Sequence, residues 1–160
     1  DLERIGGFAA IAEYIADDYQ LSARIRTLGL GVLMSRYVVE TSLPDETWAS
    51  VWRHQVRWAR TIRVSRGDGY AGLPVTFATL WSMVLAGAGL WWAAAVVFGL
   101  RLAAGLAAIR VLGDRQSLRN AWLIPFRDLG AVVVWAAGLF GKDVVWRGRR
   151  LKLTRDGRIT

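Results

Sequence analysis

The 160-residue chain has no cysteine and only one histidine. The absence of cysteine excludes a disulfide framework and a thiolate metal site. Acidic side chains are also few: 13 Asp and Glu stand against 21 Lys and Arg, which leaves a net charge of +8. The first ten residues carry mixed charge and no initiator Met, so they do not form a signal peptide, and we expect the chain to be part of a longer protein.

Hydrophobic residues, in contrast, are abundant. They make up 54% of the chain and include nine Trp, a combination that with basic flanks is typical of a membrane protein rather than of a nucleic-acid-binding protein. Residues 71–100 contain no charge, and about 20 such residues suffice to cross the hydrocarbon core. Because the apolar character resumes after Arg101, we predict a transmembrane hairpin over 71–112 that turns between Gly87 and Trp92.

A polar loop and a third apolar segment follow over 113–147. Pro125, Arg127 and Asp128 interrupt this segment and leave only 129–141 uncharged. That stretch is short for a full crossing, so an interfacial or re-entrant segment fits it about as well as a span does.

Basic residues indicate the orientation. They cluster before the hairpin at 53–66, after it at 110–119, and in the region that leads into a basic tail at 148–160. The positive-inside tendency places all three clusters in the cytoplasm, which requires an even number of crossings. We therefore favour a two-helix hairpin with a third segment that does not cross.

Residues 1–70 have the pattern of part of a soluble α/β domain. Apolar side chains at helical spacing predict a helix that is capped by Asp17 or Asp18 and ends at Gly29. Segment 32–41 is rich in β-branched and aromatic residues and predicts a strand.

A second helix is predicted from about Thr47 to Ser65, after a turn that contains Pro44 and two acidic residues suited to a helix start. It is amphipathic at 100° per residue. One face carries Trp48, Val51, Gln55, Trp58 and Ile62, and the opposite face carries Arg53, Arg57 and Arg60.

Two roles are open for Asp17 and Asp18. Adjacent carboxylates at a helix start are explained by capping and by the helix dipole, and spacing alone favours this interpretation. The alternative is that one of them acts as a general base on an acceptor hydroxyl.

The stretch "RHQVRW" also has two interpretations. Its arginines are suited to water or to anionic lipid headgroups beside a membrane segment, which is the simpler interpretation. Alternatively, Arg57 binds a diphosphate through its fork of donors while Trp58 offers an apolar face to an acceptor. His54 could carry a proton, although a single histidine more often only forms a hydrogen bond.

These motifs carry a family resemblance. The segment "GGFAAIAEYIADDYQL", the pentapeptide "HQVRW", the membrane segments and "WRGRRLKL" occur in this order. Together they resemble the carboxyl-terminal part of ceramide glucosyltransferases and of the related bacterial hopanoid-associated glycosyltransferases, over essentially the whole chain.

The resemblance implies a GT-A type domain on the cytosolic face of a membrane, in a bacterium the inner membrane. Such a domain transfers a hexose, with inversion, from a UDP-sugar to the hydroxyl of a lipid such as ceramide or a hopanoid. Its partners would be the UDP-sugar, the lipid acceptor and the bilayer, with no nucleic acid. A divalent metal, Mg or Mn, is expected in the complete protein, with its ligands outside this chain, so the piece alone should be inactive.

The resemblance also assigns roles to residues. The last Asp of the acidic motif is Asp18, which becomes the general base. Arg57 and Trp58 match the end of the pentapeptide and would bind the diphosphate and the substrate. The first position, usually Gln or Arg, is His54 with Gln55 beside it, and both stay candidates.

The remaining arginines of the stretch, Arg60, Arg63 and Arg66, are interpreted as the cytoplasmic anchor of the hairpin. Two other functions are weighed against glucosylceramide synthesis. One is a hopanoid-linked transfer of N-acetylglucosamine, and the other is a non-catalytic membrane anchor or scaffold.

Overall fold

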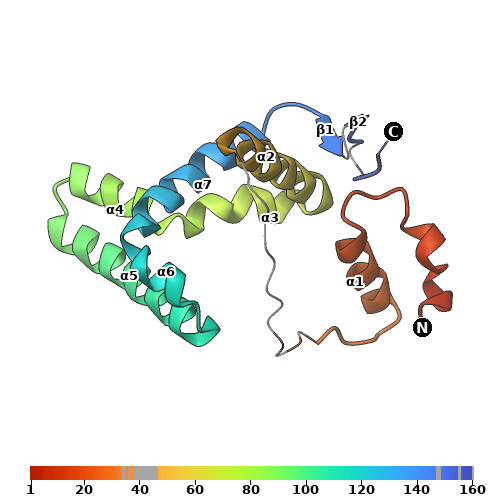
Figure 1. Ribbon diagram of the computed structural model, residues 1–160, viewed down its shortest axis with the longest axis horizontal. Coiled ribbons are helices and arrows are strands. Elements are labelled where there is room, and N and C mark those ends of the chain that lie inside the picture. Colours follow the sequence, from red (N-terminus) through yellow and green to blue (C-terminus); the bar gives the residue numbers. More distant parts are fainter. Residues whose placement is uncertain (34, 36, 38–46, 147–148, 155, 160) are drawn as a thin grey trace. The chain divides into compact units, whose positions relative to one another are not determined.

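A computed structural model describes the chain except residues 34, 36, 38–46, 147–148, 155 and 160. The chain forms two compact units. Unit 1 comprises Asp1–Ala71 and Ala137–Thr160, and unit 2 comprises Gly72–Ala136. Helices dominate the described residues, which contain one two-stranded sheet (Figure 1).

Unit 1 contains short helices, two longer helices and the sheet. The elements are η1 (Glu3–Ile5), η2 (Phe8–Ala10), α1 (Asp17–Thr27), α2 (Trp48–Ser65), α3 (Gly67–Gly72, which ends at the unit boundary), β1 (Asp143–Trp146) and β2 (Arg149–Lys152). Its buried apolar side chains are Ile5, Ile11, Ala16, Val56, Ala59, Tyr70, Val144 and Leu153.

Helix α1 lies where the sequence predicts a helix, but its cap is different. The N-cap residue is Ala16, without a side-chain cap, and Asp17 and Asp18 form the first turn. The capping prediction is therefore wrong, although two carboxylates in the first turn still favour the helix dipole. The helix ends at Thr27, and Gly29 follows with a φ of 76°.

The strand predicted over 32–41 lies mostly outside the described residues. The four residues described there, at 32, 33, 35 and 37, are not in a strand. The turn predicted at Pro44 is also outside the described residues. Helices alone are described in 1–71, so the α/β character expected for 1–70 is not seen in this part.

Helix α2 confirms the helix predicted from about Thr47 to Ser65. Thr47 caps it, because its side-chain oxygen accepts the backbone N–H of Ser50 at 3.2 Å. The face that packs, however, is not the predicted apolar one. Val56 and Ala59 are buried, whereas Trp48 and Trp58 are exposed.

Close packing explains this choice of face. A Cβ built on Gly138 would lie 2.7 Å from Ala59 Cβ and 2.1 Å from the Tyr70 hydroxyl oxygen. Two chain segments can come this close only where the facing side chains are small. Helix α2 therefore packs through Val56 and Ala59, and its large aromatic side chains stay exposed to solvent.

The carboxyl-terminal residues fold as part of unit 1. Strands β1 and β2 are antiparallel, with Asp143 opposite Lys152 and Trp146 opposite Arg149. After β2, Leu153 and Ile159 form an isolated antiparallel bridge. The segment predicted as a basic cytoplasmic tail over 148–160 is therefore structured wherever it is described.

Unit 2 contains the apolar helices. They are η3 (Leu73–Thr76), α4 (Ala78–Gly87), α5 (Trp91–Leu112), α6 (Arg115–Arg119), η4 (Ala121–Leu123) and the start of α7 (Ile124–Gly138). Helices α4 and α5 pack against each other across a turn at residues 88–90, inside the predicted range (Figure 1).

Two helical stretches of the described residues are long and apolar enough to cross a membrane. They are Trp91–Leu112 and Ala121–Gly138, with mean hydropathies of 1.9 and 1.2. A third candidate is the pair Gly67–Thr76 and Ala78–Gly87, bent by 51° at its break. The third apolar segment, which we expected to stop short of a crossing, is thus part of a continuous stretch of sufficient length.

The charges that interrupt this segment in the sequence are paired in the structure. Arg101 of α5 donates from Nε to Asp128 Oδ2 at 2.8 Å and from Nη2 to Asp128 Oδ1 at 2.6 Å. Thr79 of α4 donates its hydroxyl to Asp128 Oδ2 at 2.6 Å. Because this bidentate pair neutralises Arg101 and Asp128 together, neither charge by itself excludes a membrane location.

Candidate active site

The acidic motif, Tyr14 to Tyr19, is held in place by the end of the chain. Ile15 donates its backbone N–H to the Gly157 carbonyl at 3.2 Å, and Ile159 donates to the Glu13 carbonyl at 2.9 Å. Tyr14 and Arg158 form an antiparallel bridge between these hydrogen bonds. The residues just before α1 therefore take part in a small backbone pairing that no local pattern in the sequence predicts.

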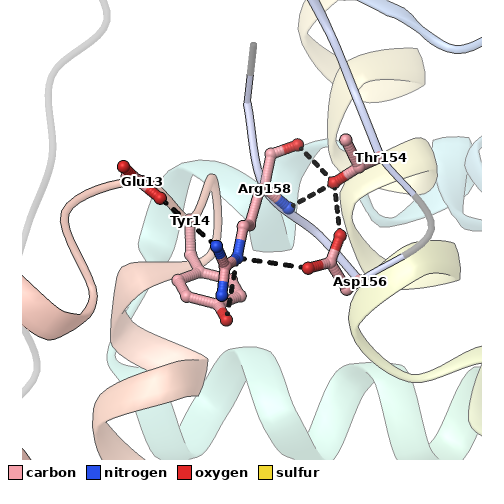
Figure 2. Close-up of polar contacts among 5 residues, drawn as sticks. All are labelled: Glu13, Tyr14, Thr154, Asp156 and Arg158. Atoms are coloured by element: carbon pink, nitrogen blue, oxygen red, sulfur yellow. Dashed lines mark hydrogen bonds and ion pairs between the residues drawn. The ribbon is translucent and has the colours of Figure 1, made fainter.

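Arg158 is the centre of this contact (Figure 2). Its Nε donates to the Tyr14 hydroxyl at 3.2 Å and lies 3.1 Å from Asp156 Oδ2, and its Nη1 lies 3.5 Å from Glu13 Oε2. The guanidinium carbon is 5.3 Å from the centroid of the Tyr14 ring, within range of a cation–π contact. Thr154 completes the group by donating its hydroxyl to Asp156 Oδ1 at 2.5 Å.

The charges of this group support one another. The hydrogen bond from Thr154, with the Arg158 charge as a smaller cause, lowers the pKa of the Asp156 carboxyl. The Tyr14 hydroxyl and the neighbouring carboxylates raise the pKa of Arg158. Arg158 and Asp156 therefore both stay charged at neutral pH. Their contacts hold the backbone that leads into α1 in place.

Asp18 lies at the exposed start of α1, directly after this fixed backbone. Its Oδ1 accepts the backbone N–H of Tyr19 at 2.7 Å, and it makes no ion pair with any residue that the structure describes. Asp17, beside it, accepts the N–H of Asp18 at 2.9 Å. An exposed carboxylate without a cationic partner is available to accept a proton, as the assignment of Asp18 requires.

The pentapeptide lies in the middle of α2. His54 and Trp58 are one turn apart, with ring centroids separated by 5.3 Å and planes tilted by 44°. Gln55 and Trp58 are exposed, and Arg57 is half-buried. The structure brings His54 to Trp58, and it leaves the Trp58 ring accessible to a substrate.

Asp18 and the pentapeptide belong to the same compact unit. Within the described residues, no hydrogen bond or ion pair joins Asp18 to His54, Gln55 or Trp58. The structure thus places these candidates on two helices, α1 and α2, of one unit.

Two arginines of α2 have a role that the sequence analysis did not assign. Arg60 donates from Nε to the Phe140 carbonyl at 2.9 Å and from Nη1 to the Asp143 carbonyl at 2.6 Å. Arg63 donates to the carbonyls of Leu139 and, at 2.7 Å, of Gly141. Since α7 ends at Gly138, these arginines satisfy carbonyls that follow the helix end.

The anchor interpretation of Arg60 and Arg63 needs correction for this reason. Their guanidinium groups bind the chain itself, so they are not reserved for lipid headgroups. In the sequence, the one sign of this carbonyl-binding role is positive charge near a helix end. The carbonyls themselves lie about eighty positions further along the chain, so no local pattern connects them to Arg60 and Arg63.

Metal ligation was also tested against the residues present. Among the described residues, no group of three or more His, Asp or Glu side chains could hold a metal ion. The side chains of this part of the chain therefore do not fit a metal-binding role, and no reaction step is assigned to a metal here.

A family model described as glycosyl transferase family 21 matches residues 1–159. The chain belongs to glycosyl transferase family 21. No curated protein and no solved structure matches it.

Membership of family 21 confirms the resemblance to the ceramide glucosyltransferase family over nearly the whole chain. It also supports a transferase activity, which implies a sugar donor and an acceptor as partners. The GT-A fold, the closer relation to hopanoid-associated enzymes and the roles of single residues stay predictions.

Proposed function

We propose that this family 21 chain is the carboxyl-terminal part of a membrane-bound, inverting glycosyltransferase. It moves a hexose from a UDP-sugar to a lipid hydroxyl, most like ceramide glucosyltransferase. The observation that carries the proposal is Asp18, an exposed carboxylate without an ion pair in the described residues, on a helix start that the Arg158 contact holds.

The reaction assigns one task to each group. Asp18 takes the proton of the acceptor hydroxyl as its oxygen bonds to the anomeric carbon, and the bond from that carbon to the diphosphate oxygen breaks. The departing UDP gains negative charge, and Arg57 stabilises it. Trp58 offers its exposed ring to the lipid next to the reacting hydroxyl.

The membrane helices suit this substrate. The basic residues that precede and follow unit 2 favour the cytoplasm by the positive-inside tendency. A lipid acceptor then needs only to lift its headgroup from the bilayer to reach unit 1, which we place in the cytoplasm.

A divalent metal, Mg or Mn, remains an expectation for the complete protein. Its chemistry there would be to neutralise the diphosphate of the donor. The described residues supply no ligand set for it, so its ligands would come from elsewhere in the complete protein.

The first test is Asp18→Asn in the complete protein. Loss of the general base should lower the rate of transfer by about 10²–10⁴-fold. Turnover is measured with a radiolabelled UDP-sugar and lipid acceptor in membranes. Asp17→Asn is the matched control, because it removes the neighbouring carboxylate and should retain most of the activity.

Near-normal turnover of Asp18→Asn would exclude Asp18 as the base. The level of membrane-inserted protein is compared in both variants, so that loss of activity is separated from loss of protein.

The second test concerns the acceptor. Trp58→Ala should raise the KM for the lipid while leaving the KM for the UDP-sugar nearly unchanged, and Trp58→Phe should restore much of the lipid affinity because it keeps an apolar ring. Unchanged acceptor kinetics in Trp58→Ala would show that Trp58 does not contact the lipid. Substituting His54 and Gln55 separately shows which of them takes the first position of the motif.

The choice of substrate is tested by pairing each donor with each acceptor. UDP-glucose and UDP-N-acetylglucosamine are incubated with ceramide and with a hopanoid polyol. Glucosylceramide is the product we expect. A hopanoid product would instead favour the hopanoid-associated relatives, and no transfer with any pair would favour a non-catalytic membrane anchor.

A further inference from the structure

Two depressions lie in unit 2 near the connection from α5 to η4. The first has a volume of about 420 Å³ and is lined by four residues with polar side chains: Arg115, Gln116, Arg119 and Asn120. The second has a volume of about 360 Å³ and is apolar. It is lined by Phe98, Leu102, Leu106, Ala121, Trp122, Ile124 and Pro125.

The two depressions adjoin each other along the chain. Asn120 lines the polar one and Ala121, the next residue, lines the apolar one. On α5 the apolar lining consists of Phe98, Leu102 and Leu106, which are four residues apart and so lie on one helix face. We name the polar depression the basic pocket and the apolar one the apolar groove.

Their location matches the layers of a bilayer. The candidate membrane helix α5 ends at Leu112, and the next candidate stretch begins at Ala121. Residues 113–120, which include the whole lining of the basic pocket, therefore connect two membrane stretches and lie at headgroup level. The apolar groove is lined by the helices themselves and extends to the depth of the acyl chains.

Among the described residues, no carboxylate forms an ion pair with the arginines of the basic pocket. Arg115 and Arg119 are one helical turn apart, a spacing at which like charges repel. Both are exposed, and neither makes an ion pair in the part of the chain that the structure describes. The nearby Asp114 carboxylate is engaged with Ser117, from which it accepts the backbone N–H at 2.9 Å and the hydroxyl.

We propose that the basic pocket and the apolar groove together bind one anionic phospholipid. Arg115 and Arg119 bind the phosphate through their guanidinium forks, with Gln116 and Asn120 as further donors, and an acyl chain fills the apolar groove. A soluble phosphate would leave the groove unused, and a zwitterionic lipid such as phosphatidylcholine would bring its own ammonium cation beside the two arginines. The proposal depends on membrane insertion of these helices and is independent of sugar transfer.

The test uses the complete protein in detergent micelles, titrated with phosphatidylglycerol and, separately, with phosphatidylcholine of the same acyl chains. Bound lipid is counted by native mass spectrometry. We expect phosphatidylglycerol to bind more tightly. Arg119→Gln should weaken it about fivefold and the double variant Arg115→Gln/Arg119→Gln about thirtyfold, from the usual contribution of a basic residue near an anionic lipid.

Arg110→Gln is the matched control. Arg110 is an exposed arginine in the last turn of α5, at the same end of the helix, but it lines neither depression. The Arg110→Gln variant should bind phosphatidylglycerol with an affinity within about twofold of that of the unmodified protein, because the charge it removes does not line the basic pocket. Melting temperatures of all variants show whether each is folded.

Glycerophosphoglycerol, which has the same phosphodiester headgroup and charge as phosphatidylglycerol but no acyl chain, tests the groove. It should not compete with phosphatidylglycerol at equal concentration. Equal affinity for the two phospholipids, an equal loss in Arg110→Gln and Arg119→Gln, or effective competition by glycerophosphoglycerol would each overturn the proposal.

Discussion

Each unit of this protein contains an arginine–carboxylate group that joins residues far apart in the sequence, and the two groups differ mainly in their surroundings. In unit 2 the side chains of Arg101 and Asp128 are 23% and 13% exposed. In unit 1 the side chain of Arg158 is 49% exposed, and its partners Glu13 and Asp156 are 72% and 59% exposed. Both groups contain an arginine with short contacts to a carboxylate, so the comparison isolates the effect of burial.

Burial decides what each group contributes. An exposed ion pair adds little to stability because water screens it, whereas breaking a buried pair leaves a charge without a partner or water. The Arg101–Asp128 pair, with Thr79, joins α4, α5 and α7 and is expected to hold unit 2 together. The Arg158 group instead determines where the backbone before α1 lies.

The largest expected effect follows from removing one partner of the less exposed pair. Asp128→Ala leaves Arg101 without its bidentate carboxylate and should lower the free energy of unfolding of unit 2 by about 2–3 kcal/mol, less than for a fully buried pair because both side chains are partly exposed. The change is measured by titration with SDS in mild detergent micelles.

The double variant Arg101→Leu/Asp128→Leu is the control for this prediction. Replacing both charges with apolar side chains of similar size should restore most of the lost stability. If Asp128→Ala costs less than about 1 kcal/mol, or if the double variant is as unstable as the single one, burial is not what distinguishes the two groups.

A smaller effect is expected at Thr79, which is buried and donates its hydroxyl to Asp128. Thr79→Val keeps the shape but removes the donor, and it should lower the free energy of unfolding by about 1–2 kcal/mol in the same titration. Thr79→Ser retains the hydroxyl and should recover the hydrogen bond. A loss below about 0.5 kcal/mol in Thr79→Val would show that the hydrogen bond to Asp128 contributes little.

The smallest effect on stability is expected in the exposed group. Arg158→Gln should leave the overall unfolding nearly unchanged but loosen the pairing between Ile15 and Gly157. Faster hydrogen exchange at the Ile15 amide would report this local change, and a large drop in overall stability would contradict the comparison. The transfer rate should fall as well if α1 presents Asp18 to the substrate.

The exposed group also predicts a dependence on pH. Because the folded structure lowers the pKa of Asp156, its contribution is present above the ordinary carboxyl value near 4 and is lost as the pH falls through the lower folded value. The NMR shift of the Ile15 amide should therefore change only in acid, and Asp156→Asn should abolish that change. A transition near neutral pH would show that another group controls the contact.

The helices were predictable because their signals are local. The periodic pattern of α2 and the charge-free run before Arg101 are both contained in neighbouring residues. The cap of α1 was predicted incorrectly, because Ala16 rather than an aspartate is its N-cap residue. The packed face of α2 was also predicted incorrectly, because the close approach at Gly138 leaves room only for the face of α2 that carries small side chains. The residues of the candidate site come from their motifs and stay predictions, whereas the support of the acidic motif by Arg158 was not predictable from the sequence.

By itself, the sequence determined the family, the apolar helices and the residues Asp18, Arg57 and Trp58 as candidates for chemistry. Only the tertiary structure decided that the carboxyl-terminal segment supports the acidic motif, that Arg60 and Arg63 bind backbone carbonyls, and that Arg101 neutralises Asp128. The physical reason is distance along the chain. Local patterns report hydrophobicity and helix ends, whereas a charge finds its partner only after the chain has folded.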